Sequence, residues 1–552
     1  MNSTVSNLFS LLCFALVIGL CGGPALADEG PSQQLAQTTL TRIEQWNDQI
    51  KAVISVHPGL MNHAAQLDRE RRSGEIRGAL HGVPILIKDN IESNGLPTTA
   101  GSLALAGNET GRDAFLVEHL RNSGLLVVGK ANLSEWANFR SERSSSGWSG
   151  VGGQARNPYD INRSPCGSSS GSAVAVAAGM VPLAVGTETN GSIICPSAAN
   201  GIVGIKPTVG LVSRRGIVPI SHTQDTAGPM AANVRDAAFL LNAMTVFDPL
   251  DSASPKNQLV FERDYTTALK SKGLQGKRIG VVRSLTGFHE GVDERFSQAV
   301  ADLAEAGAEI VDDLSLPQYP DGFQAAAYDV LLFEFKHDLN GYLADLPGAA
   351  SALTLEKLIE FNRQYADTEL RWFQQEVFVK SQAKDGLESA DYQKAVEWVQ
   401  SFSRAGIDDL LKEHGLDLLV SPSNGPAWSI DLVTGDKFLG GSSSFPARAG
   451  YPHITVPMGF VHGLPVGLSF YGAALSELVL IEAAYGYEQA TRHARPPADF
   501  GPWLPAVSEY AWNQDSPVGG VISKVLAVPT MVGNGARCEV AESEEGESGA
   551  CQ

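Results

Sequence analysis

Residues 113–135 read DAFLVEHLRNSGLLVVGKANLSE, and this stretch is the clearest guide to the fold. Asp113 can cap a helix that ends at Gly124, and the apolar residues 125–128 predict a buried strand directly after it. A second apolar run, residues 83–87, precedes the helix and predicts another buried strand. Strand, helix and strand in close succession are typical of parallel strands covered by helices. The stretch therefore predicts an α/β fold.

The same alternation continues on both sides of this stretch. Apolar residues at helical spacing from Leu40 to Ile50 predict an early helix, and Asn132 with Glu135 three residues later resembles a capping box that opens another. We therefore expect a single large α/β/α domain, residues 28–505, whose central sheet is mixed, mainly parallel, twisted and covered by helices. Further strands are expected at residues 278–282, 309–311, 418–420, 454–456 and 466–470, and helices at 293–306, within 323–413 and at 477–491.

The two ends of the chain differ from this domain. Residues 1–27 carry no charged side chain and consist of an apolar core, a Gly-Gly-Pro break and an A-x-A-like site at residues 25–27. This pattern predicts a secretory signal peptide, and a mature protein that is exported, periplasmic or secreted, and free of the membrane; an uncleaved membrane anchor is the alternative. Residues 506–552 are rich in Gly and Ser and end acidic, which predicts a partly disordered tail. Cys538 and Cys551 can pair there in an oxidising compartment.

Charge and composition exclude several classes of function. The 552 residues include 41 Lys plus Arg and 61 Asp plus Glu, a net charge of −20, and there is no basic cluster. Binding to nucleic acid or to an anionic membrane surface is therefore not expected, because both depend on Lys and Arg. The six cysteines form no Cys-x-x-Cys pair with a histidine cluster, so no zinc site is predicted.

The most unusual stretch is SPCGSSSGSA at residues 164–173. A flexible linker is a poor explanation because the stretch runs directly into an Ala- and Val-rich buried segment. No phosphate-binding loop is present either. Residues 167–171 satisfy G-x-S-x-G, but a nucleophile elbow needs a buried strand immediately before it, and residues 157–165 contain two prolines and mostly polar side chains. We therefore reject the elbow.

A second Gly- and Ser-containing loop is GTETNGS at residues 186–192, after the apolar run 181–185. Such a strand end can direct several backbone N–H groups at one point and so form an oxyanion hole beside a nucleophile. Taken alone, this loop is better explained as an ordinary turn. Lys88, which closes the apolar run 82–87, is the third candidate. A buried lysine can lose its charge and act as a general base, whereas a lysine that reaches solvent has no such role.

These three pieces, with residues 201–208, 224–229 and 449–459, jointly resemble the amidase signature family. The resemblance covers about residues 40–496, and residues 166–172 and 186–196 look closest to the bacterial peptide amidases, which deamidate the C-terminal amide of peptides. It implies the amidase signature fold and a hydrolase that releases ammonia from a small or short-peptide carboxamide, without metal or organic cofactor.

Carried over residue by residue, the family's catalytic triad falls on Lys88, Ser168 and Ser192. Ser192 would be the nucleophile, and Ser168, after a non-proline cis peptide bond from Gly167, would relay its proton to a neutral Lys88. Backbone N–H groups of the loop would hold the oxyanion of the acyl-transfer intermediate. The expected oxyanion-binding residues are Thr189, Asn190 and Gly191.

This chain departs from much of the family, which has Gly-Gly-Ser-Ile-Arg, at Asn190 and Ile194, so substrate preference stays open. The alternatives are a general aliphatic or aryl amidase, a glutamyl-tRNA amidotransferase A-like subunit, or an inactive amidase-like binding protein. Cys166 and Cys195 flank the two serines, and we interpret them as small packing residues.

Overall fold

Strand β2, Pro84–Lys88, lies in the sheet between β3, Leu126–Ala131, and β6, Leu183–Glu188, and pairs with both in parallel. The computed structural model describes residues 29–504. Side chains of β2 alternate between the two faces of the sheet, as strand geometry requires. Ile85 and Ile87 pack into the hydrophobic core on one face, and Leu86 packs into the core on the other.

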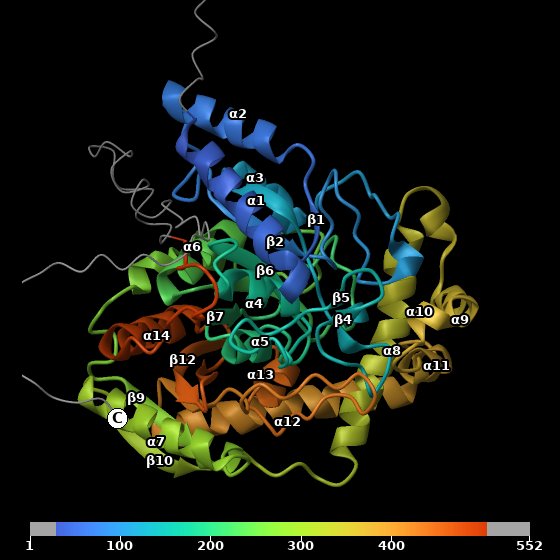
Figure 1. Ribbon diagram of the computed structural model, residues 1–552. Helices are drawn as coiled ribbons and strands as arrows, with labels where there is room; N and C mark the ends of the chain where they lie inside the picture. The colour runs from blue at the N-terminus through green and yellow to red at the C-terminus, as the bar shows by residue number, and fades with distance from the viewer. Residues whose placement is uncertain (1–28, 505–552) are drawn as a thin grey trace, which may run out of the picture. The chain divides into compact units, whose positions relative to one another are not determined.

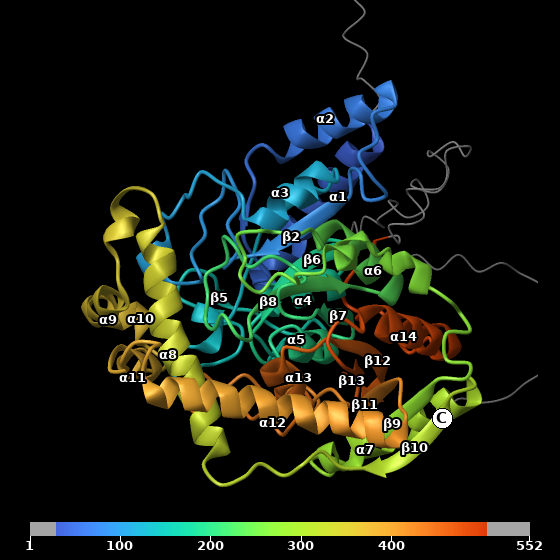
Figure 2. The same cartoon turned by 180° about the vertical axis from the view of Figure 1, so that it is seen from behind.

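The main sheet has eleven strands in the order β1-β3-β2-β6-β8-β7-β12-β13-β11-β9-β10 (Figures 1 and 2). A separate two-stranded sheet pairs β4, Trp148–Ser149, with β5, Gly153–Gln154. The remaining strands of the main sheet are β1 (Val53–Val56), β7 (Val203–Lys206), β8 (Thr226–Ala231), β9 (Arg278–Val282), β10 (Glu309–Leu314), β11 (Leu418–Pro422), β12 (His453–Val461) and β13 (Leu464–Tyr471).

The expected α/β fold with a mixed sheet is confirmed, but the expectation that the sheet is mainly parallel is wrong. Four neighbouring pairs are parallel and six are antiparallel. The parallel pairs lie where helices connect the strands, which is the pattern of residues 83–131 and 278–311. The centre is different: β12 and β13 form a hairpin whose turn residues, His462 and Gly463, have φ of 48° and 82°. Positive φ at both turn positions is typical of a tight hairpin turn, which reverses the chain.

Helices cover both faces of the sheet (Figures 1 and 2). The core that contains Leu86 packs under one group of helices, and the core that contains Ile85 packs under the other. The first group comprises α1 (Pro31–Ile50), α2 (Leu60–Ser73) and α4 (Ser170–Ala177). The second comprises α3 (Phe115–Asn122), α6 (Val234–Met244), α7 (Glu290–Glu305) and α14 (Glu477–Thr491). Helices α12 (Ala390–His414) and α13 (Ser444–Ala449) pack in a separate core cluster with Leu419 of β11 and Tyr471 of β13, and α5 (Ile194–Ala199) contacts β7, β12 and β13.

The region expected to be helix-rich, residues 323–413, is confirmed. It begins with α8, Phe323–Ala344, which packs against α12 through aromatic side chains such as Phe323 and Phe402. Three shorter helices follow α8: α9 (Leu355–Gln364), α10 (Ala366–Glu369) and α11 (Glu376–Gln382). Helices α9 and α11 contact α8, and α10 contacts α9.

The capping box expected at Asn132 and Glu135 is wrong. Residues 135–138 form a short 3-10 segment, η2, rather than an α-helix. The Asn132 amide instead donates to backbone carbonyls, including that of Lys51 at 2.9 Å, and Glu135 is buried in an ion pair with Arg140. Asp113 does not cap α3 either, because its carboxylate accepts from the Asn94 backbone and from Arg121. Long-range partners therefore displaced both local capping patterns.

The expected signal peptide, residues 1–27, and the expected tail, residues 506–552 with Cys538 and Cys551, lie outside the described residues. Within residues 29–504, no helix combines the length and the apolar character that a membrane crossing requires.

Candidate active site

Lys88 ends β2 on the face of the sheet that α4 covers. It lies two residues after Leu86, so the strand alternation directs both side chains to this face. The side chain of Lys88 is completely buried, which excludes the alternative of a lysine that reaches solvent. Its Nζ lies 2.7 Å from Oγ of Ser168. The structure thus brings together two of the three residues that the family resemblance singled out.

Ser168 precedes α4 in a loop whose peptide bond from Gly167 is cis, as the resemblance implied. A Cβ at position 167 would collide with Oγ of Ser134, so this position has room only for glycine. The backbone N–H of Ser134 also donates to the Ser168 carbonyl at 3.0 Å. No strand lies within residues 157–165, so the nucleophile elbow is correctly rejected.

Ser192 lies in the loop 189–193 between β6 and α5. Its carbonyl accepts a 3.1 Å hydrogen bond from the N–H of Ser169, the neighbour of Ser168. The hydroxyl of Ser169 in turn accepts from the N–H of Thr187 and donates to its carbonyl, at 3.1 and 2.9 Å. Ser169 therefore joins the two serine-bearing loops. The Ser192 hydroxyl itself has no hydrogen-bond partner among residues 29–504, and Ser192 is 8% exposed, so it is free to meet a ligand.

The 189–193 loop presents unoccupied backbone donors. The N–H groups of Asn190, Gly191 and Ser192 make no hydrogen bond within the described part of the chain. The next two N–H groups, of Ile193 and Ile194, both donate to one carboxylate oxygen of Glu188, at 2.8 and 3.0 Å. Glu188 thereby holds the end of the loop and leaves the preceding N–H groups available to an oxyanion.

Both sides of this loop are fixed by side chains. Oγ1 of Thr189 donates to Asp225 at 2.6 Å, and Oδ1 of Asn190 accepts from Oγ of Ser443 at 2.8 Å. Ser443 is the residue before α13. The side chain at position 190 therefore anchors the loop to α13.

Burial lowers the pKa of Lys88 to about 7, although the carboxylates of Asp225 and Glu188 act in the opposite direction. Burial raises the pKa of Asp225 to about 6, although hydrogen bonds from Thr189 and from the backbone of Ser221 and Ile220 lower it. Near neutral pH a large fraction of Lys88 therefore carries no proton, and its lone pair can accept one.

A cavity of about 440 Å³ is lined by Asn90, Thr187, Thr189 and the segment that contains Asp225, and Thr187 joins its wall to Lys88. Lys88, Ser168 and Ser192 are not among its lining residues. Its volume lies in the range of small-ligand sites. His222, at its rim, lies with Glu334 and Asp338 in a group whose possible ligand atoms are within 4.8 Å of one another. Both nitrogens of His222 already have protein partners, Asp338 at 2.9 Å and the Tyr392 hydroxyl at 3.2 Å. This group is therefore a closed hydrogen-bond network.

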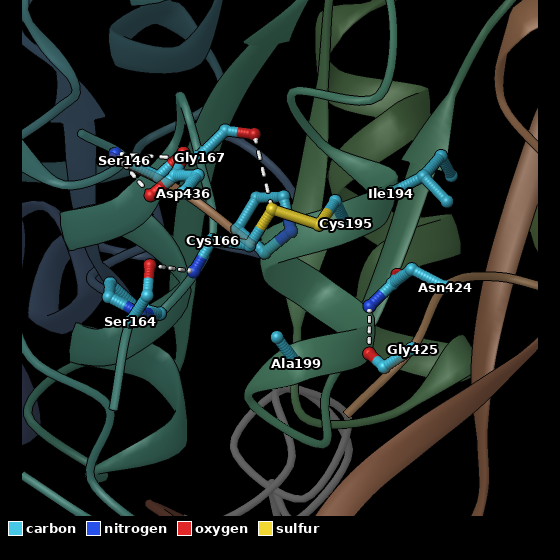
Figure 3. Close-up of a disulfide and its surroundings, with 12 residues drawn as sticks. Ser146, Ser164, Cys166, Gly167, Ile194, Cys195, Ala199, Asn424, Gly425 and Asp436 are labelled. Carbon is cyan, nitrogen blue, oxygen red and sulfur yellow. Dashed lines mark hydrogen bonds between the residues drawn. A yellow bond between two sulfur atoms is a disulfide. The ribbon is translucent and has the colours of Figure 1, made fainter. Parts of the chain in front are cut away.

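Cys166 and Cys195 form a disulfide, and our interpretation of them as packing residues is wrong (Figure 3). The two Cα atoms are 5.9 Å apart. Cys166 lies two residues before Ser168 and Cys195 three residues after Ser192, so the bridge ties together the two serine-bearing loops. It is nearly buried and packs against Ala199 and Trp428. The sequence offered one indication: both cysteines belong to a chain with a predicted export signal.

Sequence reasoning also missed four residues around the triad candidates. Asn90 and Thr187 contact each other, and Thr187 contacts Lys88, while Glu188 and Asp225 hold the 189–193 loop. Thr187 and Glu188 lie within residues 186–192 and Asp225 within residues 224–229, so recognised motifs already contained them, and Asn90 lies two residues after Lys88. Only the fold shows that Asp225 contacts the 189–193 loop.

Comparison with known proteins shows the family to which the chain belongs. The Amidase family model matches residues 34–481. A probable amidase of Arabidopsis thaliana is 40% identical over 478 residues, covering 84% of this chain and 88% of the plant protein. The A subunit of the glutamyl-tRNA(Gln) amidotransferase of Symbiobacterium thermophilum is 35% identical and covers 85% of this chain and 96% of its own length. The structure of native peptide amidase from Stenotrophomonas maltophilia is 48% identical with a TM-score of 0.81, and covers 84% of this chain and 95% of its own. The chain therefore belongs to the amidase family, the amidase signature enzymes, and is a hydrolase of amide carbon–nitrogen bonds.

Proposed function

We propose that this amidase deamidates C-terminal peptide carboxamides with Ser192 as nucleophile, Ser168 as proton relay and Lys88 as base. One observation carries the proposal: the amine of a completely buried lysine, whose pKa is about 7, lies 2.7 Å from the hydroxyl of Ser168. A lysine in this state accepts a proton at neutral pH, which is the property that a general base needs.

In this mechanism Lys88 takes the proton of Ser168, and Ser168 takes that of Ser192 as its oxygen attacks the amide carbon. The unoccupied N–H groups of residues 190–192 stabilise the negative oxygen of the tetrahedral intermediate. Ser168 then returns the proton to the leaving nitrogen, ammonia departs, and an acyl-enzyme remains on Ser192. Water hydrolyses this ester by the same relay.

The preference for peptide amides rests on local sequence and on overall similarity. Residues 166–172 and 186–196 resemble the corresponding motifs of bacterial peptide amidases. Ile194 occupies the place where much of the family has Arg, which argues against the second candidate, a role in a tRNA-dependent amidotransferase.

A substrate panel tests the preference. Purified protein is expected to release ammonia from short peptide amides and to leave internal peptide bonds intact. Rapid turnover of a short aliphatic amide with no action on peptide amides would identify a general aliphatic amidase instead. Activity that appears only with partner subunits and tRNA would favour the amidotransferase.

Serine variants test the mechanism. Ser192→Ala is expected to abolish activity and labelling by a fluorophosphonate, because it removes the hydroxyl that forms the acyl-enzyme in this mechanism. Ser168→Ala removes the relay and is expected to cost at least ~10²-fold in kcat. Ser169→Ala is the matched control. It disturbs the contacts that Ser169 makes between the two serine-bearing loops but leaves Ser192 in place, so labelling should persist. Labelling of Ser192→Ala together with its loss in Ser169→Ala would restore the elbow hypothesis.

We also propose that the protein is exported to the periplasm or secreted after removal of residues 1–27. The uncharged apolar start supports this proposal, and so does a disulfide beside the site, because disulfides persist in oxidising compartments. Protein recovered from its native host is expected to begin at Asp28. An intact Met1 on a membrane-bound enzyme would contradict export.

A further inference from the structure

Thr187, in β6, contacts the amine of Lys88 twice. Its Oγ1 lies 2.8 Å from Nζ and its backbone carbonyl oxygen lies 3.3 Å away. With Ser168 Oγ at 2.7 Å, Nζ has three oxygen partners. These three oxygens fill the positions around a tetrahedral amine nitrogen.

The number of hydrogens on Nζ of Lys88 determines how the contacts with Thr187 orient the amine. A protonated lysine has three N–H donors, whereas a neutral lysine has two N–H donors and one lone pair. The Thr187 carbonyl can only accept, so it takes one N–H. When Oγ1 of Thr187 takes the second, the lone pair of the neutral amine faces Ser168. This is the arrangement in which Ser168 can deliver a proton.

Asn90 holds the Thr187 side chain in this position. Its Nδ2 donates to Oγ1 of Thr187 at 3.0 Å. Asn90 is only 3% exposed, and its own backbone carbonyl accepts from the N–H of Val218 at 2.8 Å. Ser169 fixes the Thr187 backbone from the other side through bonds to both its N–H and its carbonyl. Thr187 is therefore restrained in both its side chain and its backbone.

We propose that Thr187 is a positioning residue that directs the lone pair of Lys88 at Ser168, and that Asn90 holds the Thr187 hydroxyl for this purpose. The inference rests on the proposed base and relay roles of Lys88 and Ser168. Thr187 acts through Lys88, so its loss should change the base without removing the nucleophile.

The proposal has a signature in the pH profile. The charged groups that act on Lys88 are Asp225, in the segment before β8, and Glu188, at the end of β6. Both remain in a Thr187→Val variant. Valine removes an acceptor of the ammonium form, so the pKa of Lys88 falls and the acid limb of kcat/KM moves to lower pH. The plateau rate falls as well, because the lone pair is no longer held toward Ser168.

The experiment measures kcat, KM and the pH profile of Thr187→Val, Thr187→Ser and wild type with a peptide amide. Thr187→Val should lower the plateau kcat at least ~10-fold. It should also move the acid limb of kcat/KM to lower pH by about one unit, which matches the free energy of a hydrogen bond to a charged group. KM should change by no more than about twofold, since the interaction is not with the substrate. Thr187→Ser keeps Oγ1 and should restore both the rate and the limb.

Thr245→Val is the matched control, because it also removes a buried threonine hydroxyl, one that bonds the Leu241 carbonyl at the end of α6. The acid limb of kcat/KM for Thr245→Val should coincide with that of wild type. Should Thr187→Val fail to fold, Asn90→Leu carries the test and should lower kcat about 3- to 10-fold with a smaller shift of the limb in the same direction.

Each outcome separates this proposal from the mechanism on which it rests. A Thr187→Val enzyme with wild-type kcat and an unmoved limb would overturn the positioning role, and so would an Asn90→Leu enzyme with both unchanged. An active Lys88→Met enzyme, or a wild-type profile without an acid limb, would instead overturn the role of Lys88 as base.

Discussion

Nζ of Lys88 and Oγ of Ser168 lie 2.7 Å apart, although 80 residues separate them in the chain. Lys88 is placed at the carboxyl end of β2, and the parallel neighbour β6 ends beside it at Thr187 and Glu188. Carboxyl ends of parallel strands meet at one edge of a sheet, where loops carry functional residues. Ser169 and the disulfide then fix the loops of Ser168 and Ser192 at this edge.

The rate should depend on pH through the protonation of Lys88. Its pKa is about 7, and only the neutral amine can accept a proton. We therefore expect kcat/KM to rise about tenfold per pH unit below this pKa and to level off above it. Lys88→Arg should lose at least ~10²-fold at every pH, because a guanidinium stays protonated. A Lys88→Arg enzyme as active as wild type would contradict the base role.

The same lysine should make the fold less stable near neutral pH. Its pKa is about 7 in the folded chain and 10.5 ordinarily, so between these values the unfolded chain binds more protons and stability rises with pH. At pH 7 the shift corresponds to about 4–5 kcal/mol, part of which the lost hydrogen bonds of Ser168 and Thr187 offset in a variant. Lys88→Met should therefore be inactive but more stable by about 1–3 kcal/mol at pH 7.

Urea unfolding of Lys88→Met and wild type at pH 7 and pH 9 measures this difference. The advantage of the variant should shrink at pH 9, where less free energy is needed to deprotonate the lysine of the wild type. A variant that is less stable at both pH values would show that the amine contributes more through its hydrogen bonds than its burial costs.

Loss of the disulfide should destabilise the protein. The bridge closes a loop with a sequence separation of 29 residues, and the chain-entropy treatment assigns about 3–4 kcal/mol to a loop of this length. We expect Cys166→Ala/Cys195→Ala to unfold at a lower urea concentration by a corresponding amount. Peptide mapping without reductant should recover the two cysteine-containing peptides of the wild type as one cross-linked species. Separate peptides, or an unchanged unfolding midpoint, would contradict the bridge.

Local sequence pattern was enough for most of the elements, whereas the candidate triad came from the resemblance to a known family. Strands β2, β9, β11 and β13 fall where apolar runs predict them, since buried strands need such runs. Pattern was not enough for strand direction in the centre of the sheet, where the β12–β13 hairpin turns at His462 and Gly463 rather than at a more familiar Asn-Gly.

Contacts between residues far apart in the chain could not be predicted from local sequence pattern either. The Cys166–Cys195 bridge depends on how α5 packs beside the Ser168 loop. The contact of Asp225 with Thr189 depends on the antiparallel pairing of β8 with β6. The capping box predicted at Glu135 was wrong for the same reason. A local capping pattern does not show that Glu135 pairs with a buried Arg140 in the folded chain.

The buried carboxyl of Glu135 should make the stability of the fold depend on pH. Its carboxylate is buried with Arg140 at 3.1 Å, accepts from the Gly150 N–H at 3.2 Å, and lies beside the equally buried Glu369 of α10. Burial raises the pKa of Glu135 well above its usual range; Arg140 acts against this shift and Glu369 adds to it. The folded chain therefore holds a proton that the unfolded chain releases, so the contribution of this group to stability falls as pH rises above its ordinary value.

Glu135→Gln mimics the protonated carboxyl without its dependence on pH. It should be more stable than wild type at pH 7 by on the order of 1 kcal/mol, and its advantage should vanish near pH 4. Glu142→Gln is the matched control with the opposite sign: the Lys380 ammonium lowers the pKa of the exposed Glu142, so removing that charge should not stabilise the fold at pH 7. Thermal unfolding at pH 4, 5.5 and 7 measures both. A Glu135→Gln protein that is less stable than wild type at pH 7 would mean that Arg140 needs the Glu135 carboxylate in its ionised form.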